Sequence, residues 1–169
     1  MKIAQEKTVY LIGGTMGVGK TTVCQQFKQI LPNAVFLDGD WCWDMAPFQV
    51  TEETKAMALD NICHVLNNFL SCSLYENIIF GWVLHQQETW DEICGRLNTG
   101  GCQVKRVALT CTPQALKDRL NKDIAAGLRQ PDILERSTAR LPLYRQLKAC
   151  TVDTSNLTPE ETARRIILL

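Results

Sequence analysis

The chain has 169 residues, with 18 lysines and arginines balanced by 18 aspartates and glutamates, so its formal net charge at pH 7 is zero. This length is typical of one domain that buries about two-thirds of its unfolded surface, and we expect a single domain over residues 1–169. The balanced charge disfavours nucleic acid as a partner, because a polyanion-binding surface needs excess positive charge.

Apolar, β-branched runs alternate with helical segments along the whole chain. The expected strands, in chain order, are residues 9–12, 34–37, 77–83, 103–110 and 149–153. The expected helices are residues 21–30, 52–74, 88–97, 113–126, 132–148 and 159–168. Near-continuous apolar strands separated by helices indicate an α/β fold with three layers, in which a doubly wound, five-stranded parallel sheet is covered on both faces. Ligands of such folds bind at the carboxyl ends of the strands.

Neither a membrane span nor a signal peptide is evident. No apolar run approaches the roughly 18 residues of a membrane-spanning helix, and residues 1–7 contain no apolar signal core. Eight cysteines are present, but none forms a C-x-x-C pair and their spacing matches no zinc-binding pattern. We therefore expect a cytoplasmic protein with reduced, buried thiols and no membrane partner.

The first expected strand is followed by a complete phosphate-loop motif, G-x-x-x-x-G-K-[ST], which leads into the first helix. Its glycines let backbone N–H groups form an anion-binding nest, and the helix N-terminus favours phosphate. Lys20 is expected to reach the β- and γ-phosphates, and the Thr21 hydroxyl to ligate Mg²⁺. The residues predicted to bind ATP here are Gly14, Thr15, Met16, Gly17, Val18, Gly19, Lys20, Thr21 and Thr22.

A second acidic motif, Asp38-Gly39-Asp40, ends the second expected strand, which in many such folds lies next to the phosphate loop. Period-two spacing on an extended segment would send both carboxylates to the same side. Asp38 is then expected to hold Mg²⁺, Asp40 to orient or deprotonate an attacking hydroxyl, and Gly39 to let the backbone approach the substrate. The alternative is that Asp38-Gly39 is a simple turn and Asp40 caps the following segment.

Together, these two motifs resemble those of the small P-loop kinases, such as shikimate kinase, gluconate kinase, adenylylsulfate kinase and antibiotic phosphotransferases. The segments 128–131, 140–144 and 152–154 follow Arg119 in the order seen in shikimate-kinase-like enzymes. The resemblance implies a P-loop NTPase fold with a helical lid at about residues 119–140. It further implies that Arg119 lies near adenine, that Arg129 lies in the lid over the phosphates, and that Arg140 reaches the substrate or the phosphates.

A lid role for these arginines is chemically reasonable, because a lid arginine stabilises charge on the transferred phosphoryl group and excludes water. Gly127 provides a hinge-like break between two helical pieces. The alternative interpretation is that Arg119 and Arg136 are solvated helix-surface residues.

The substrate side departs from the shikimate-kinase pattern. No arginine precedes Arg96, and Lys55 is the only cation between the second and third expected strands. This shortage argues against an acceptor that bears a carboxylate or phosphate. Aromatic and other side chains occupy these positions instead, namely Trp41, Trp43, Met45, Phe48, Trp82 and His85. If they line one pocket, the acceptor is flat or partly apolar; otherwise the tryptophans attach the long helix to the sheet.

The sequence thus predicts an enzyme, an ATP- and Mg²⁺-dependent kinase that transfers a phosphoryl group to a hydroxyl of a small, not strongly anionic molecule. The predicted catalytic residues are Lys20, Asp40 and Arg129, and the predicted substrate residues are Asp40, Trp41, Trp82, His85 and Arg140. The nearest alternative is a nucleoside or nucleotide kinase. A slowly hydrolysing regulatory module is the alternative from another class, although no guanine-reading N-K-x-D motif is present. A monomer and a homodimer are both compatible with the sequence.

Overall fold

The computed structural model describes residues 6–169, so the first five residues of the expected domain lie outside it. One parallel sheet contains all five strands in the order β2-β3-β1-β4-β5. The strands are β1 (Thr8–Gly14), β2 (Ala34–Asp38), β3 (Asn77–Trp82), β4 (Gln103–Thr110) and β5 (Cys150–Asp153). The helices are α1 (Lys20–Ile30), α2 (Glu52–Ser71), α3 (Gln87–Arg96), α4 (Pro113–Ala125), α5 (Ile133–Arg140) and α6 (Pro159–Ile167), with two 3₁₀ helices, η1 (Gly39–Cys42) and η2 (Leu141–Gln146).

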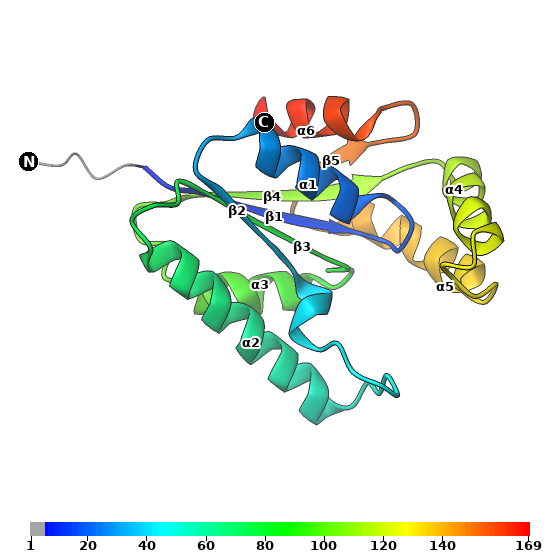
Figure 1. Ribbon diagram of the computed structural model, residues 1–169, viewed down its shortest axis with the longest axis horizontal. Coiled ribbons are helices and arrows are strands. Elements are labelled where there is room, and N and C mark those ends of the chain that lie inside the picture. Colours follow the sequence, from blue (N-terminus) through cyan, green and yellow to red (C-terminus); the bar gives the residue numbers. More distant parts are fainter. Residues whose placement is uncertain (1–5) are drawn as a thin grey trace, which may run out of the picture.

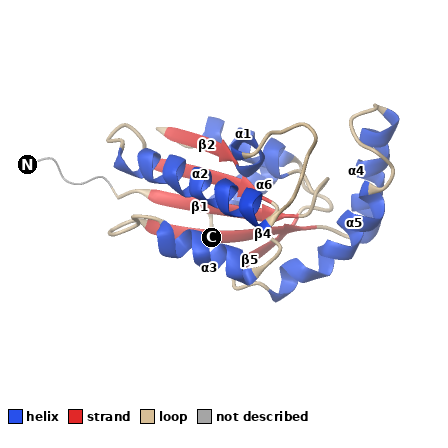
Figure 2. Ribbon diagram, turned by 90° about the horizontal axis from the view of Figure 1, so that it is seen from below, coloured by secondary structure: helices blue, strands red, loops and turns tan. Residues whose placement is uncertain are grey.

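Helices cover both faces of the sheet, which confirms the predicted three-layer architecture. α1 and α6 lie on one face, and α2 and α3 lie on the other (Figures 1 and 2). Each face has its own hydrophobic cluster, with Phe27 and Ile166 fully buried on the first and Leu66 and Trp90 buried on the second. α4 and α5 extend beyond the carboxyl ends of the strands, where the phosphate loop also lies (Figure 1).

The expected strands and helices are all present, with ends that shift by a few residues, but the segment 132–148 is not one helix. It divides into α5 and η2, and Pro142 stands in the first turn of η2. Proline has no N–H to donate to the preceding turn and its ring clashes there, so the α-helix ends before it.

The order of the strands corrects one expectation about the acidic motif. β1 pairs with β3 and β4, so β3 lies between the phosphate-loop strand and β2. Side chains at the end of β3 therefore stand between the phosphate loop and the acidic motif.

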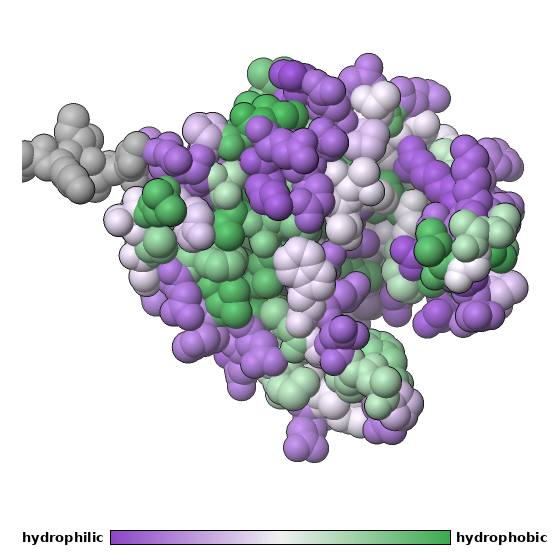
Figure 3. Space-filling model, in the orientation of Figure 1, coloured by the Kyte–Doolittle hydropathy of each residue, from purple (hydrophilic) through white to green (hydrophobic). Residues whose placement is uncertain are grey.

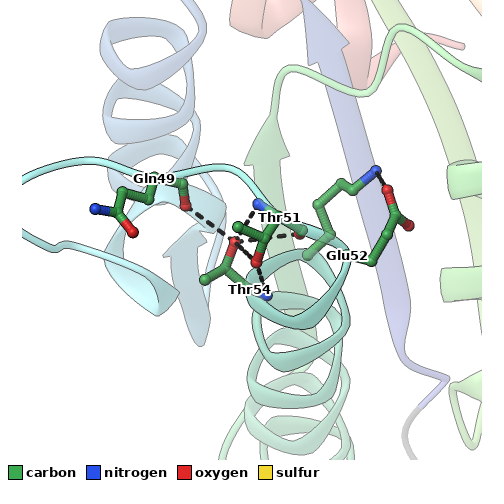
Figure 4. A network of polar contacts seen from close by, with 5 residues as sticks. Gln49, Thr51, Glu52 and Thr54 are labelled. Atoms are coloured by element: carbon green, nitrogen blue, oxygen red, sulfur yellow. Dashed lines mark hydrogen bonds and ion pairs between the residues drawn. The ribbon is translucent and has the colours of Figure 1, made fainter.

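The N-terminus of α2 is fixed by a reciprocal cap (Figure 4). The Thr51 hydroxyl accepts from the Thr54 amide at 3.1 Å, and the Thr54 hydroxyl accepts from the Thr51 amide at 2.8 Å. The Thr54 hydroxyl also lies 3.0 Å from the carbonyl oxygen of Gln49, and Lys55 pairs with Glu52 at 2.5 Å. This network holds the loop that enters α2, and that loop borders the site described below.

All eight cysteines are free, but the expectation that they are buried holds only in part. Cys24, Cys63 and Cys111 are buried, Cys150 is exposed, and the others are half-buried. Within residues 6–169, no helix combines the length and the apolar character needed to cross a membrane.

Candidate nucleotide and acceptor site

The phosphate loop links the end of β1 to the start of α1, as its sequence predicts. Gly17 and Gly19 have φ values of +84° and +103°, a left-handed conformation that favours glycine. A Cβ at Gly17 would lie 2.4 Å from Cδ2 of Leu120, whereas a Cβ at Gly19 would meet nothing within 4 Å. The loop therefore packs on α4 at Gly17 and remains open at Gly19, where a ligand can approach the backbone.

Lys20 is the first residue of α1, and its Nζ donates to the carbonyl oxygen of Thr15 at 3.1 Å. Burial lowers the pKa of Lys20 to about 8, although the charges of Asp40 and Asp38 oppose this shift. The ammonium group is held by a neutral carbonyl and has no ion-pair partner among the described residues, so it is available to an anionic ligand.

Asp38 connects the acidic motif to the phosphate loop. Its Oδ2 accepts from the Thr21 hydroxyl at 2.8 Å, and its Oδ1 accepts from the Asp40 amide at 3.0 Å. The second bond makes Asp38 the N-cap of η1, so Asp40 lies in a helical turn and not on an extended segment. The expected alternation of side chains is therefore wrong, and it is Asp38, not Asp40, that caps the next segment.

Trp82, the last residue of β3, contacts both other residues of the acidic motif. Its indole N–H donates to Oδ1 of Asp40 at 3.0 Å. A Cβ at Gly39 would lie 2.4 Å from Cγ of Trp82. The group that approaches Gly39 closely is thus the indole of Trp82, which sequence reasoning did not foresee.

Arg119 on α4 is not a solvated surface residue. Its guanidinium donates to the carbonyl oxygen of Val18 at 3.1 Å, to the Thr154 hydroxyl at 3.0 Å and to the Thr154 carbonyl oxygen at 2.6 Å. It thereby joins the phosphate loop to the segment after β5. Beside it lies a shallow cavity of about 210 Å³, whose lining includes Thr22 and Pro159. This is the position that the resemblance assigns to adenine.

The other arginines of the predicted lid have distinct surroundings. Gly127, with φ +72°, follows the end of α4 and breaks the helical segment as expected. Arg129 pairs with Asp123 at 3.1 Å, and its charge is near enough to Lys20 to help lower the pKa of that residue. Arg136 is exposed and pairs with Asp132, also at 3.1 Å.

A buried polar cluster, which the sequence did not reveal, ties α5 to the phosphate loop. The Thr15 hydroxyl lies 2.9 Å from the carbonyl oxygen of Ser137 and 2.8 Å from its hydroxyl. The Ser137 hydroxyl also donates to the carbonyl oxygen of Met16. Thr15 and Ser137 are both 0% exposed, so buried hydrogen bonds attach α5 to the phosphate loop.

A cavity of about 290 Å³ opens beside Lys20 and Asp40. In Figure 3, the surface is hollowed between the lobe that carries the start of α2 and the lobe formed by α4 and α5. The lining consists of Met16, Lys20, Asp40, Trp43, Phe48, Val50, Lys55, Trp82, Val83, Leu84, His85, Gln86, Thr89, Arg136 and Arg140. Four of the five predicted substrate residues line this cavity.

The exception is Trp41. Its side chain is 57% exposed and its ring packs against Phe36, with centroids 5.3 Å apart. Trp41 lies in η1 and is not among the residues that line the cavity. Its place in the wall is taken by Trp43, whose ring centroid lies 5.6 Å from that of Trp82 and 5.1 Å from that of Phe48.

Polar side chains also lie at the segment that follows β3. Burial, and then the positive charge of Arg140, lower the pKa of His85, so that its imidazole is neutral at pH 7. The Tyr144 hydroxyl donates to the carbonyl oxygen of Val83 at 2.5 Å and thereby ties η2 to the end of β3.

A larger, open depression of about 770 Å³ lies between residues such as Val104 and Cys150, at the opposite ends of the strands from the phosphate loop.

The metal-binding capacity of the site is small. Within the part of the chain that the structure describes, no three His, Cys, Asp or Glu side chains come together in a way that could hold a metal ion. Thr21 and Asp38 do bring a hydroxyl and a carboxylate oxygen to 2.8 Å beside the loop. This sparse oxygen set suits Mg²⁺, which binds to one or two protein oxygens together with substrate phosphates and water.

The fold and the loop geometry define a P-loop protein with a kinase-like fold. A family model described as "AAA domain" matches residues 11–139, and the chain belongs to this family. No curated protein sequence matches the chain.

Solved structures similar to this chain include several small kinases. A gluconokinase from Sinorhizobium meliloti is 18% identical with a TM-score of 0.67, over 98% of this chain and 91% of that chain. A shikimate kinase from Acinetobacter baumannii, in complex with shikimate, is 22% identical with a TM-score of 0.62, over 97% and 92%. A tunicamycin resistance protein from Deinococcus radiodurans is 18% identical with a TM-score of 0.69, over 96% and 95%. The predicted resemblance to the fold of small P-loop kinases is confirmed.

Proposed function

We propose that the protein is an ATP- and Mg²⁺-dependent phosphotransferase that acts on a hydroxyl of a small, not strongly anionic molecule. One observation carries this proposal: Lys20 of the phosphate loop and Asp40 of the acidic motif line the same cavity of about 290 Å³. In one cavity, a phosphate-binding cation can hold the nucleotide phosphates while a carboxylate orients the acceptor hydroxyl, and phosphoryl transfer needs both.

The backbone N–H groups of residues 17–22 and the Lys20 ammonium would hold the triphosphate. The adenine ring of ATP would lie beside Arg119. Thr21 and Asp38 would hold Mg²⁺. When bound, the metal ion would neutralise charge on the phosphate oxygens. Thr21 and Asp38 already contact each other directly, so little rearrangement is needed to present both oxygens to one cation.

Asp40 would orient the acceptor hydroxyl and receive its proton. In the transfer, the acceptor O–H bond breaks and a bond forms between that oxygen and the γ-phosphorus. The bond from the γ-phosphorus to the bridging oxygen breaks, and its electron pair leaves with ADP. Arg129 would close over the transferred group and Arg140 would contact the acceptor or the phosphates, whose charge both arginines stabilise.

The character of the acceptor follows from the cavity walls. Trp43, Phe48 and Trp82 form one aromatic wall, with neighbouring centroids 5.1 and 5.6 Å apart. Lys55 and Arg136, which also line the cavity, already pair with Glu52 and Asp132 respectively. An acceptor with a flat or apolar face and few charges suits these walls, and a nucleoside is one compound of this kind.

The test is Mg²⁺-dependent ATP turnover with a panel of acceptors. The panel contains gluconate, shikimate, nucleosides, nucleoside monophosphates, aminoglycosides and hydroxylated aromatic compounds. We expect one uncharged, ring-bearing alcohol to stimulate turnover, and we expect Asp40→Asn to lower that stimulated rate by about 100-fold or more while MgATP still binds. Slow hydrolysis that no acceptor stimulates and that Asp40→Asn leaves unchanged would instead indicate a regulatory P-loop module.

A further inference from the structure

We propose that Trp82 is a positioning residue that holds the Asp40 carboxylate in place while its ring forms part of the acceptor wall. The proposal rests on the proposed function, because Asp40 is there the group that receives the acceptor proton. Trp82 would thus couple recognition of the acceptor to orientation of the base.

The first observation is the hydrogen bond between the two side chains. The indole N–H of Trp82 donates to Oδ1 of Asp40 at 3.0 Å. Within residues 6–169, Oδ2 of Asp40 has no hydrogen-bond partner, and Asp40 lines the cavity. An indole N–H only donates, so it cannot take the proton that the carboxylate receives. One oxygen of Asp40 is therefore held, and the other is left for the acceptor hydroxyl.

The second observation is that the indole itself is locked. Trp82 is 7% exposed, and its ring lies over Gly39, where even a methyl group would come within 2.4 Å of Cγ. The Trp43 and Phe80 rings pack against it, at centroid distances of 5.6 and 6.4 Å. A donor fixed in this way restrains Asp40, which is exposed and would otherwise choose freely among its rotamers.

The third observation concerns place in the fold. β3 lies between β1 and β2, so the end of β3 is the position from which one side chain can meet both the acidic motif and the cavity. Trp82 does both, since its N–H faces Asp40 and it also lines the cavity. An acceptor ring that packs on the indole lies beside the held carboxylate, where its hydroxyl meets the free oxygen.

The hydrogen bond between Trp82 and Asp40 can be tested in the absence of any substrate. In a ¹H–¹⁵N spectrum, the four tryptophans give four indole N–H signals, which single Trp→Phe variants assign. We expect Asp40→Asn to move the Trp82 signal upfield, because an amide oxygen is a weaker acceptor than a carboxylate, and to leave the Trp90 signal in place. A Trp82 signal that does not respond to Asp40→Asn overturns the proposal.

The positioning role is tested by kinetics with the acceptor found in the panel above. We expect Trp82→Phe, which keeps an aromatic ring but loses the N–H, to lower kcat by about 10- to 100-fold with the KM for MgATP within about twofold. In an Asp40→Asn background, the same change should have an effect within about twofold, because it acts through Asp40. An equal loss of kcat in both backgrounds would mean that Trp82 contributes only to the cavity wall and does not position Asp40.

Three further variants separate positioning of Asp40 from general damage to the fold. Trp43→Phe alters the same wall at an indole whose N–H has no hydrogen-bond partner among the described residues, and it should raise the KM for the acceptor more than it lowers kcat. Gly39→Ala should displace the Trp82 indole and reproduce the kcat loss of Trp82→Phe, whereas Gly95→Ala, where a Cβ meets nothing within 4 Å, should not. If the Trp82 signal responds as expected but no acceptor stimulates turnover in any variant, the proposed function fails, and the catalytic part of this inference fails with it.

Discussion

At the scale of single residues, Lys20 shows how the fold changes the chemistry of a motif. Burial lowers its pKa to about 8, and the charges of Asp40 and Asp38 limit that shift. An unburied lysine would remain protonated until about pH 10.4. The ammonium of Lys20 is therefore partly deprotonated in mildly alkaline solution, before any nucleotide binds.

This pKa predicts that nucleotide binding depends on pH. The affinity for MgADP should fall as the pH rises from 7 to 9.5, because the neutral amine cannot pair with phosphate. Near pH 8, binding should also take up about half a proton, since the phosphates favour the protonated form. Calorimetry in two buffers of different ionisation enthalpy measures this uptake. The Lys20→Arg variant keeps its positive charge throughout this pH range and should remove the pH dependence. If its affinity for MgADP still declines with pH, the titration of Lys20 is not the cause.

The phosphate loop could be predicted from the sequence because it is one short segment with local geometry. The contact between Thr21 and Asp38 is not local, but it could be expected because a parallel sheet brings the carboxyl ends of its strands to one edge. The bonds from Trp82 to Asp40 and from Arg119 to Thr154 join residues 42 and 35 positions apart. Such pairs depend on tertiary packing, which no spacing in the sequence encodes.

At the scale of elements, the attachment of α5 to the phosphate loop limits which part of the predicted lid can move. Ser137 is fully buried and bonded to Thr15 and Met16, so we expect α5 to stay attached to the loop. Residues 126–132, which contain Gly127 and Arg129, have no such attachment to the loop among the described contacts. Closure over a nucleotide is thus expected in this shorter segment.

Two neighbouring substitutions test the attachment. Ser137→Ala should destabilise the protein by about 1–3 kcal/mol, because it leaves the Met16 carbonyl oxygen without its hydrogen-bond partner and removes one of the two partners of the buried Thr15 hydroxyl. Thr138→Val should be neutral or stabilising by up to about 1 kcal/mol, because the Thr138 hydroxyl is buried and has no hydrogen-bond partner among the described residues. Urea unfolding compares the two free energies, and equal losses in both variants would show that the cluster has no special part in stability.

Elements were predictable where a local signal marked them. Apolar runs located all five strands, and Gly127 marked the end of α4. η1 was missed because the signal for it is a side-chain cap: Asp38 can either continue a strand or accept from the amide two residues later. Pro142 was a visible signal for the end of α5, and its effect was underestimated.

At the scale of the whole molecule, the candidate nucleotide site is built from segments far apart in the chain. The phosphate loop follows β1, while Thr154 and Pro159 come from the segment after β5. A ligand that joins these parts stabilises the entire domain, since only the folded chain presents them together.

Binding should therefore raise the melting temperature. At MgADP concentrations of 100 times Kd, the added stability is about 2.7 kcal/mol, which for a domain of this length corresponds to roughly 5–10 °C. Thermal melts with and without MgADP measure it. Lys20→Ala should abolish the rise while melting at a similar temperature without ligand, and an undiminished rise in this variant would place the nucleotide elsewhere.

The hydrogen bonds that hold Arg119 have a consequence for the synthesis of the protein. The family match ends at residue 139, yet Arg119 is held by Thr154, which lies fifteen residues beyond that end. A growing chain thus displays its complete phosphate-loop motif long before β5 and α6 exist to close the site. The order of translation thus leaves the candidate nucleotide site incomplete until Thr154 and Pro159 have been made.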